Sequence, residues 1–281
     1  IEVPHQSLPD LAREDPPDSV QTLIGDYLNR ARLMGQRTAE LHLALARDAD
    51  NPNFAPVPFS SLHQRSIYQS MRGRCRRVIR HLRHRLDSLP EPVQPQAREL
   101  VDRVDEVLLR FRSLLEFKIA AQKLRIHGDF HLGQLLCTET DYVIIDFEGE
   151  SHRPISERRL KRSPLRDVAG LMNSFHYAAS AGLTGSEHNH PNQPPLFRSE
   201  DVSRLDPWCR FWTQWVSAVC LRHYLEVASE GTFLPRPPED LARLLNAYHL
   251  EKALESLGYE LDHRPGWVWI PIRSILQILN M

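Results

Sequence analysis

Two carboxylates and one side-chain amide stand close together in the stretch Ile126–Glu150, which reads IHGDFHLGQLLCTETDYVIIDFEGE. Asp129 follows one short β-like run, Gln134 lies five residues further on, and Asp146 comes near the end of another run. Transfer of a phosphoryl group from ATP to a hydroxyl requires a carboxylate that orients the hydroxyl and takes its proton. It also requires oxygen ligands for Mg²⁺, which carboxylates and amide carbonyls supply. Asp129 suits the first role, and Gln134 and Asp146 suit the second.

The residues around this stretch predict the elements that position it. Short β-like runs at 124–127, 135–138 and 142–147 are separated by a loop and by a turn at Glu139–Asp141, which predicts a β-hairpin. Apolar residues at helical spacing predict several helices. In the first half of the chain they cover about 19–47, the segment between the loop 51–59 and Pro90, and 100–115. In the second half they run from Ser163 to about 179, over about 206–229 and 239–257, and onward from Pro271. The expected fold class is therefore α+β, mostly α.

The motifs in this stretch resemble those of kinases. Protein kinases carry H-R-D-x-x-x-x-N followed by D-F-G, and H-G-D-F-H-L-G-Q and D-F-E stand here in the same order, with the same offset between Asp and amide. More closely, H-G-D-x-H-x-G-Q, I-D-F-E-G-E and E-R-R-x-K-x-S-P-L-R-D-V-A-G resemble the maltokinases, relatives of the aminoglycoside phosphotransferases that are often fused behind trehalose synthase. Segments 35–46, 251–261 and 264–276 extend the resemblance from about residue 19 to the end.

The resemblance implies a fold, an activity and cofactors. The fold is expected to be the C-terminal lobe of a protein-kinase-like, aminoglycoside phosphotransferase-like protein, with a small β-hairpin at the catalytic loop. The activity is expected to be phosphorylation of maltose to maltose 1-phosphate by ATP with Mg²⁺. Asp129 is then the catalytic base and Gln134 and Asp146 are Mg²⁺ ligands. Glu148, which stands where D-F-G has Gly, is expected to add a metal contact or an outer contact.

The same resemblance gives roles to further residues near the catalytic loop. His127 is the counterpart of the kinase loop histidine and is expected to shape the catalytic site rather than to carry protons. Asp167 is expected to anchor the loop through its backbone. Arg158, Arg159 and Lys161 form a basic cluster that either contacts the phosphates of ATP or makes structural ion pairs. Seven arginines on one side of the long helix before Pro90 likewise predict either a solvated face or a phosphate-binding face.

The sugar is expected to lie against the helix near residue 255. Lys252 and Tyr259 are seven residues apart and so share one helix face. They match positions at which the resembled family holds its sugar, and His131 is expected to join them. A solvated helix surface would explain Lys252 and Tyr259 equally well. Glu255 stands where the family pattern has Tyr, so this chain departs from the family at the expected sugar site.

Composition excludes several classes of function. The 35 basic and 36 acidic residues nearly cancel, so no overall charge favours nucleic acid or an anionic membrane. No apolar run approaches the roughly 20 residues that a membrane span needs. The four cysteines are scattered without a C-x-x-C pair, which is typical of reduced thiols and favours a cytoplasmic protein.

The distribution of lysines predicts that the ATP-holding half is missing. Only four lysines occur, and all lie after position 117, whereas kinase-like ATP sites use a phosphate-covering loop and a strand lysine upstream of the catalytic loop. Residues 1–18 contain four prolines, too many for a helix, and are expected to be a linker from a missing N-terminal lobe. The C-terminal lobe is expected to span 19–281, helical over 19–122 and 163–281, with the catalytic and metal-binding segment at 123–162. Such a chain is expected to be inactive alone.

Two other classes of function stay open. The first is a non-catalytic module that binds sugar or docks to a fused or associated trehalose synthase. The second is a metal-dependent hydrolase: His127, Asp129 and His131 alternate, so on a strand they would share one face and could bind a metal. His188 and His190 would have to supply further ligands.

Overall fold

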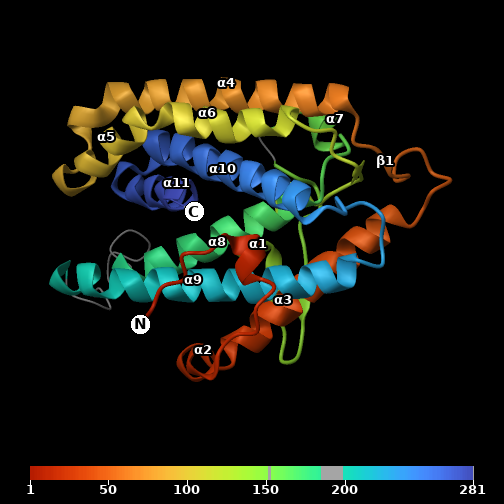
Figure 1. Ribbon diagram of the computed structural model, residues 1–281, viewed down its shortest axis with the longest axis horizontal. Helices are drawn as coiled ribbons and strands as arrows, with labels where there is room; N and C mark the ends of the chain where they lie inside the picture. The colour runs from red at the N-terminus through yellow and green to blue at the C-terminus, as the bar shows by residue number, and fades with distance from the viewer. Residues whose placement is uncertain (151–152, 185–198, 281) are drawn as a thin grey trace.

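The computed structural model describes residues 1–150, 153–184 and 199–280 and shows two layers of helices (Figure 1). One layer contains α4 (Ser61–Arg85), α5 (Gln94–Asp102), α6 (Val104–Arg112), α10 (Pro238–His263) and α11 (Trp269–Asn280). The other contains α2 (Asp18–Ile24), α3 (Tyr27–Ala46), α8 (Leu165–Thr184) and α9 (Ser199–Ala228). Because α10 packs against both α4 and α8, it joins the two layers.

The remaining elements are short. They are the helices α1 (Leu8–Leu11) and α7 (Ile155–Arg158), the strand pairs β1 (Val57–Pro58) with β2 (Gln122–Lys123) and β3 (Leu135–Cys137) with β4 (Tyr142–Ile144), and 3₁₀ turns at Leu86–Ser88, Glu91–Val93, Ser113–Leu115, Leu132–Gln134 and Pro265–Trp267. The expected long helices are all present in the described ranges.

Two expectations about local structure were wrong. The Pro-rich start of the chain does contain a helix, α1, because Pro9 occupies its first turn, where a missing N–H costs no intrahelical hydrogen bond. Leu11 of α1 is buried, and α1 packs on α9. The run 124–127 is not a strand: only Leu124 makes a β-bridge, with Arg162.

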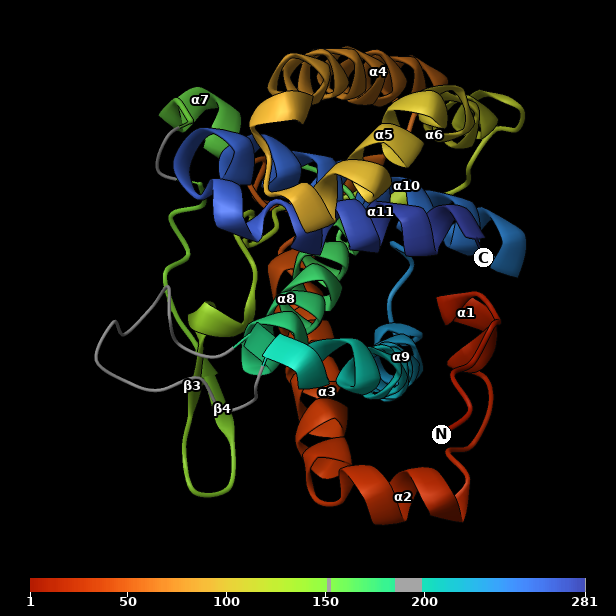
Figure 2. The same ribbon diagram turned by 90° about the vertical axis from the view of Figure 1, so that its left-hand side faces the viewer.

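The predicted β-hairpin is confirmed. β3 and β4 pair antiparallel, with Leu136 opposite Val143, and the hairpin stands beside the helical layers (Figure 2). The Arg37 guanidinium of α3 holds it there, because its Nε donates to Asp141 Oδ1 over 2.7 Å. Leu136 and Val143 remain about half exposed, which leaves an apolar surface on the hairpin.

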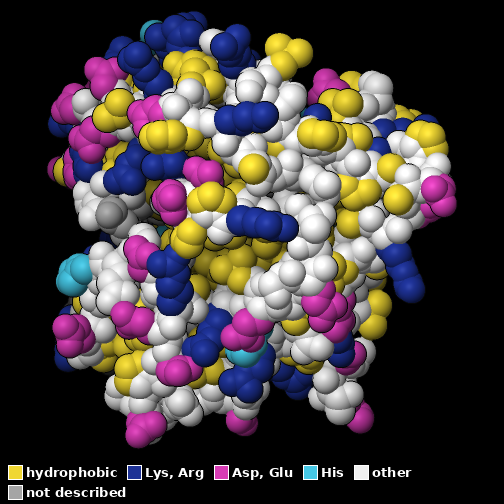
Figure 3. All heavy atoms as spheres, turned by 45° about the vertical axis from the view of Figure 1, so that its right-hand side comes forward, with side chains coloured by type: hydrophobic (Ala, Val, Ile, Leu, Met, Phe, Trp, Pro, Cys, Tyr) yellow, Lys and Arg dark blue, Asp and Glu magenta, His cyan; other side chains and the backbone are white. Residues whose placement is uncertain are grey.

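The surface agrees with the near-zero net charge. On the face that Figure 3 shows, Lys and Arg side chains are interspersed with Asp and Glu side chains. None of the helices within the described ranges has the length and apolar character to cross a membrane.

A buried histidine between the layers predicts a pH-dependent stability. His176 of α8 donates from Nε2 to the Ile270 carbonyl over 3.1 Å, and burial lowers its pKa to about 4. In the unfolded chain the imidazole takes up a proton below about pH 6.5. The free energy of unfolding is therefore expected to be intact above pH 6.5 and to fall by up to about 3 kcal/mol between pH 6.5 and 4.

The variant His176→Gln tests this expectation, because Gln can donate to the same carbonyl and does not titrate. Urea unfolding followed by circular dichroism at pH 7 and pH 4.5 should show a weaker pH dependence in His176→Gln than in the parent chain. His84→Gln, at an exposed position of α4, serves as the control. An unchanged pH dependence in His176→Gln would exclude His176 as a source.

Candidate active site

The loop after Ile126 presents Asp129 between buried neighbours. Ile126 and Phe130 are buried, whereas Asp129 is partly exposed. Gly128 has a φ of +89°, in the left-handed region that glycine enters without a steric penalty, so the chain turns sharply before Asp129. The carboxylate of Asp129 makes no hydrogen bond or ion pair within the described part of the chain, so it is available to a bound molecule.

The imidazole of His127 is bonded to the main chain through both nitrogens. Nε2 lies 2.7 Å from the Ile145 carbonyl oxygen and must donate to it, whereas Nδ1 accepts the Asp129 N–H over 3.4 Å. The ring is buried and packs on Phe130 and Phe147. His127 thus ties the loop of Asp129 to the strand that leads to Asp146, an arrangement that suits a residue that shapes the site.

Asp167, at the start of α8, holds the same loop by its backbone. Its Oδ2 accepts the His127 N–H over 2.8 Å, and its Oδ1 accepts the Gly128 N–H over 3.0 Å. His42 Nε2 lies 3.1 Å from Oδ2, and Tyr224 bonds the other nitrogen of His42. Burial acts to raise the pKa of the Asp167 carboxyl, but the hydrogen bonds and the nearby imidazoles outweigh it and hold the pKa below its ordinary value.

One face of α8 also supports the loop. Asp167, Gly170 and Ser174 follow one another at helical spacing, and Ser174 Oγ accepts the Leu132 N–H over 3.1 Å. Between them Gly170 lies directly under the Phe130 carbonyl: a Cβ there would lie 2.4 Å from the carbonyl oxygen. The backbone of α8 therefore touches the backbone of the loop.

This contact predicts that Gly170→Ala is destabilising. The added methyl group would meet a backbone carbonyl that cannot rotate away, so the free energy of unfolding is expected to fall by about 1–3 kcal/mol. Gly182→Ala is a matched control on the same helix, because nothing lies within 4 Å of its Cβ position. That variant is expected to gain about 0.5–1 kcal/mol. Urea unfolding would measure both, and a similar gain in Gly170→Ala would contradict the close contact.

Gln134 and Asp146 are brought together as expected. Gln134 Nε2 donates to Asp146 Oδ2 over 3.1 Å, and the Ile145 N–H donates to the Gln134 carbonyl over 3.0 Å. Asp146 has a φ of +65°, the one left-handed backbone outside glycine within the described ranges. Such strained backbones occur at functional sites, where the surrounding structure enforces them.

The donor set at this point fits Mg²⁺. A carboxylate and an amide are hard oxygen donors, and Mg²⁺ characteristically takes one or two protein ligands and completes its shell with water and substrate phosphates. Within the described ranges no three His, Cys, Asp or Glu side chains gather closely enough to hold a metal by themselves. Asp146 and Gln134 would therefore hold the metal together with bound phosphates.

The predicted basic cluster makes main-chain contacts. Arg158 donates to the carbonyls of Arg153 and Glu148 over 3.0 and 3.3 Å. Lys161 Nζ donates to the carbonyls of residues 52 and 55 over 2.7 and 2.5 Å and so holds the loop before β1. Arg159 and the Glu148 side chain are exposed. These contacts hold Arg158 and Lys161 in place and leave Arg159 and Glu148 open to solvent.

The three predicted sugar-binding residues fall into two groups. Burial lowers the pKa of His131. The carboxylates of Asp129 and Asp146 act to raise this pKa and the ammonium group of Lys252 lowers it further, so these four side chains lie near one another. Lys252 Nζ also lies 3.9 Å from Glu150 Oε1. Tyr259, further along α10, is about half exposed and stacks on His263 at a ring separation of 4.3 Å. The structure thus places His131 and Lys252 beside the catalytic loop and Tyr259 near the end of α10.

The structure also contains a charge cluster that no sequence pattern indicated. Its members are the carboxylates Glu150, Glu251 and Glu255 and the cations Arg74, Arg153, Arg166 and Lys252. Burial acts to raise the pKa of Glu255, but Arg166 and the other cations lower it to about 2. Glu255, which departs from the family pattern, is therefore an ion-pair partner. Arg74 also turns inward from the arginine-rich side of α4.

The geometry disfavours the metal-hydrolase alternative. His127, Asp129 and His131 lie in a loop and at the start of a 3₁₀ turn, not on a strand, and His127 has no free nitrogen. His188 and His190 lie outside the described residues.

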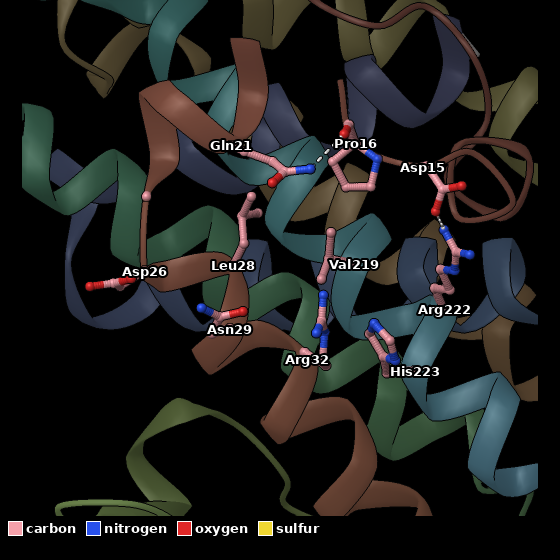
Figure 4. Close-up of a pocket in the computed structure, with 11 residues that line it drawn as sticks. Asp15, Pro16, Gln21, Asp26, Leu28, Asn29, Arg32, Val219, Arg222 and His223 are labelled. Atoms are coloured by element: carbon pink, nitrogen blue, oxygen red, sulfur yellow. Dashed lines mark hydrogen bonds and ion pairs between the residues drawn. The ribbon is translucent and has the colours of Figure 1, made fainter. Parts of the chain in front are cut away.

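A cavity of about 520 Å³ lies between α2–α3 and α9, away from the predicted site residues, none of which line it. In this cavity Asp15 and Arg222 point toward one another as an ion pair (Figure 4).

Known proteins resemble parts of this chain. The model of the phosphotransferase enzyme family (APH) matches residues 25–155, which include Asp129, Gln134 and Asp146. The glucosamine kinase of Streptacidiphilus jiangxiensis is 28% identical over 156 residues, which are 55% of this chain and 31% of that protein. The glucosamine kinase of Mycolicibacterium smegmatis is 30% identical over 155 residues, 55% of this chain and 34% of that protein. The chain thus aligns with about a third of each curated relative.

Solved structures show the fold. A glucosamine kinase in complex with glucosamine, ADP and inorganic phosphate matches with a TM-score of 0.66 at 20% identity, over 96% of this chain and 58% of that one. A second crystal form of glucosamine kinase matches with a TM-score of 0.68 at 20% identity, over 100% and 60% of the two chains. The expected mostly helical, aminoglycoside phosphotransferase-like lobe of the kinase-like fold is confirmed.

Proposed function

We propose that this chain is the catalytic and sugar-binding lobe of an ATP- and Mg²⁺-dependent sugar kinase, with maltose as the acceptor. The observation that carries the proposal is the paired arrangement around His127. The imidazole joins the loop of the unpaired Asp129 carboxylate to Ile145, the residue before Asp146, and Asp146 in turn bonds Gln134. A proton acceptor and a pair of Mg²⁺ ligands are thereby held on one framework.

In this mechanism Asp129 receives the acceptor hydroxyl by hydrogen bonding, orients it toward the γ-phosphate and takes its proton. Asp167 and His127 keep the loop fixed, so the carboxylate needs no rearrangement. Gln134 and Asp146 would hold Mg²⁺, which when bound offsets the negative charge of the phosphates. The exposed apolar pair Leu136 and Val143 offers a surface for the base of ATP.

The remaining parts of the ATP site are proposed to come from a further N-terminal lobe. Residues 1–117 contain no lysine that could clamp the phosphates from upstream of Asp129. Of the two lysines between residue 117 and Asp129, Lys118 is exposed, and Lys123 lines a cavity that none of Asp129, Gln134 and Asp146 lines. On this proposal residues 1–281 alone are inactive. Trehalose synthase is the fusion partner or associate expected of a maltokinase, and the cytoplasm is the expected compartment.

Maltose and glucosamine are the two candidate acceptor sugars. The motifs from H-G-D to the end of α10 favour maltose, whereas the relatives that match are named glucosamine kinases. An assay of ADP release by the full-length protein with ATP and Mg²⁺ should be run with maltose, glucosamine, glucose and no sugar. Maltose-dependent turnover supports the proposal, and glucosamine-dependent turnover would revise the acceptor. If calorimetry shows sugar binding but no sugar supports turnover, the proposed function would change from a kinase to a sugar-binding module.

A further inference from the structure

A strongly basic cavity borders the charge cluster and shares Arg74, Arg153, Arg166 and Glu251 with it. It has a volume of about 310 Å³ and is bounded by α4, β2, the segment 153–166 and α10. Figure 1 shows α7 beside the end of α4 that follows β1. The lining residues that carry charge are the cations Arg74, Lys123, Arg153, Lys161, Arg162 and Arg166 and the carboxylates Glu157 and Glu251. None of the proposed catalytic or Mg²⁺-binding residues lines it.

Two of these cations have no partner within the described ranges. Lys123 and Arg162 make no side-chain hydrogen bond and no ion pair there. Both side chains line the cavity, and Arg162 forms backbone hydrogen bonds of 2.9 and 3.0 Å with Leu124, the residue after Lys123. Burial lowers the pKa of both groups, and neighbouring positive charges lower it further. The Nε2 atom of His63, which also lines the cavity, is buried without a hydrogen-bond partner.

The other cations are compensated. Arg74, Arg153 and Arg166 pair with the cluster carboxylates, and Lys161 donates to two carbonyls. Counting cavity and cluster together, seven cations (the six above and Lys252) face four carboxylates (Glu150, Glu157, Glu251 and Glu255). A partly buried excess of one sign is costly unless a counter-ion offsets it. The geometry therefore favours an anion with more than one negative charge in this cavity.

We propose that this cavity binds the phosphate group of a small phosphate monoester. Arg162 offers a planar guanidinium that matches two phosphate oxygens, and Lys123 adds a point charge. The volume is in the range of small-molecule sites, so it can hold a sugar-sized body as well as the phosphate. The site does not depend on the proposed kinase activity.

The cavity is connected to the catalytic loop by short paths. Arg162 is bonded to Leu124, three residues before His127, and Arg166 directly precedes Asp167. A smaller adjoining cavity shares Arg162 and Arg166 and extends to Gly128 and Gly149. A phosphate held by Arg162 would thus fix the segment that supports the loop of Asp129.

Calorimetric titration of the whole chain with glucose 6-phosphate, inorganic phosphate and glucose tests the proposal. We expect one binding site for glucose 6-phosphate and no binding of glucose. Binding should weaken at least tenfold in the variant Lys123→Gln/Arg162→Gln, and Lys123→Arg/Arg162→Lys should restore most of it. If inorganic phosphate binds as tightly as glucose 6-phosphate, the cavity is a site for free phosphate, which the same cations would recognise.

Matched variants keep the result unambiguous. Arg76→Gln/Arg80→Gln removes the same charge from exposed positions of α4 and should leave binding unchanged. Asp146→Asn should also leave it unchanged, because Asp146 does not line the cavity. Circular dichroism and urea unfolding show whether each variant is folded. No heat at millimolar glucose 6-phosphate, or equal weakening in Arg76→Gln/Arg80→Gln, would overturn the proposal.

Discussion

Replacing Asp129 by Asn is expected to lower sugar-dependent ATP turnover by the full-length protein by roughly 10²- to 10⁴-fold. Asn has the shape of Asp but cannot take the proton of the acceptor hydroxyl. The loop itself should survive, because its supports are the backbone contacts of Asp167 and Ser174 and not the Asp129 carboxylate. The measurement is kcat from ADP release at saturating ATP and sugar, with folding checked by urea unfolding.

Glu139→Gln is the matched control for Asp129→Asn. Glu139 lies exposed at the turn of the hairpin, so the same loss of one negative charge occurs outside the proposed site. Its turnover should equal that of the parent protein. A retained kcat in Asp129→Asn would remove Asp129 as the base and, with it, the proposed reaction.

The parts of the site that could be predicted are local in sequence. Asp129, Gln134 and Asp146 lie within 18 residues of one another, and the hairpin between them brings the last two together. Turn residues and β-like runs encode that geometry directly. Periodicity likewise predicted the long helices, because their buried faces repeat at helical spacing.

The parts that could not be predicted depend on contacts between distant residues. Glu150, Arg74 and Glu255 come from three separate segments, and no pattern in any one segment indicates that they meet. Arg74 shares its helix face with exposed arginines, so its inward ion pair depends on where α10 packs. The basic cavity has the same origin, since β2, α4 and the segment before α8 each supply part of it.

Glu255 shows how a departure from a family pattern can be structural. Its carboxylate lies 2.9 Å from Arg74, 3.2 Å from Arg153 and 3.2 Å from Arg166, and its side chain is 12% exposed. A Tyr there could not compensate three guanidinium groups. We infer that sugar contacts in this region fall to the more accessible Lys252 and to His131, which lie near Asp129.

Replacing Asp167 by Asn is expected to lower the free energy of unfolding by about 3 kcal/mol. The Asn oxygen can accept one of the two N–H groups of His127 and Gly128, whereas its amide group would face the other and leave it unpaired. The pH dependence should change as well. Because the pKa of Asp167 is held low, its stabilising effect is present above the ordinary carboxyl pKa near 4 and is lost as the pH falls through the native value.

Asp50→Asn, in an exposed loop, is the control for Asp167→Asn and should unfold like the parent chain. A positioning role makes a further prediction that stability alone does not. At a temperature where Asp167→Asn is fully folded, kcat should fall while the KM for sugar changes little. The reason is that the Asp167 carboxylate holds the loop of Asp129 and is not one of the residues expected to contact the sugar. An unchanged kcat in the folded variant would mean that the loop keeps its shape without this carboxylate. In that case the two backbone hydrogen bonds would serve folding and not the placement of Asp129.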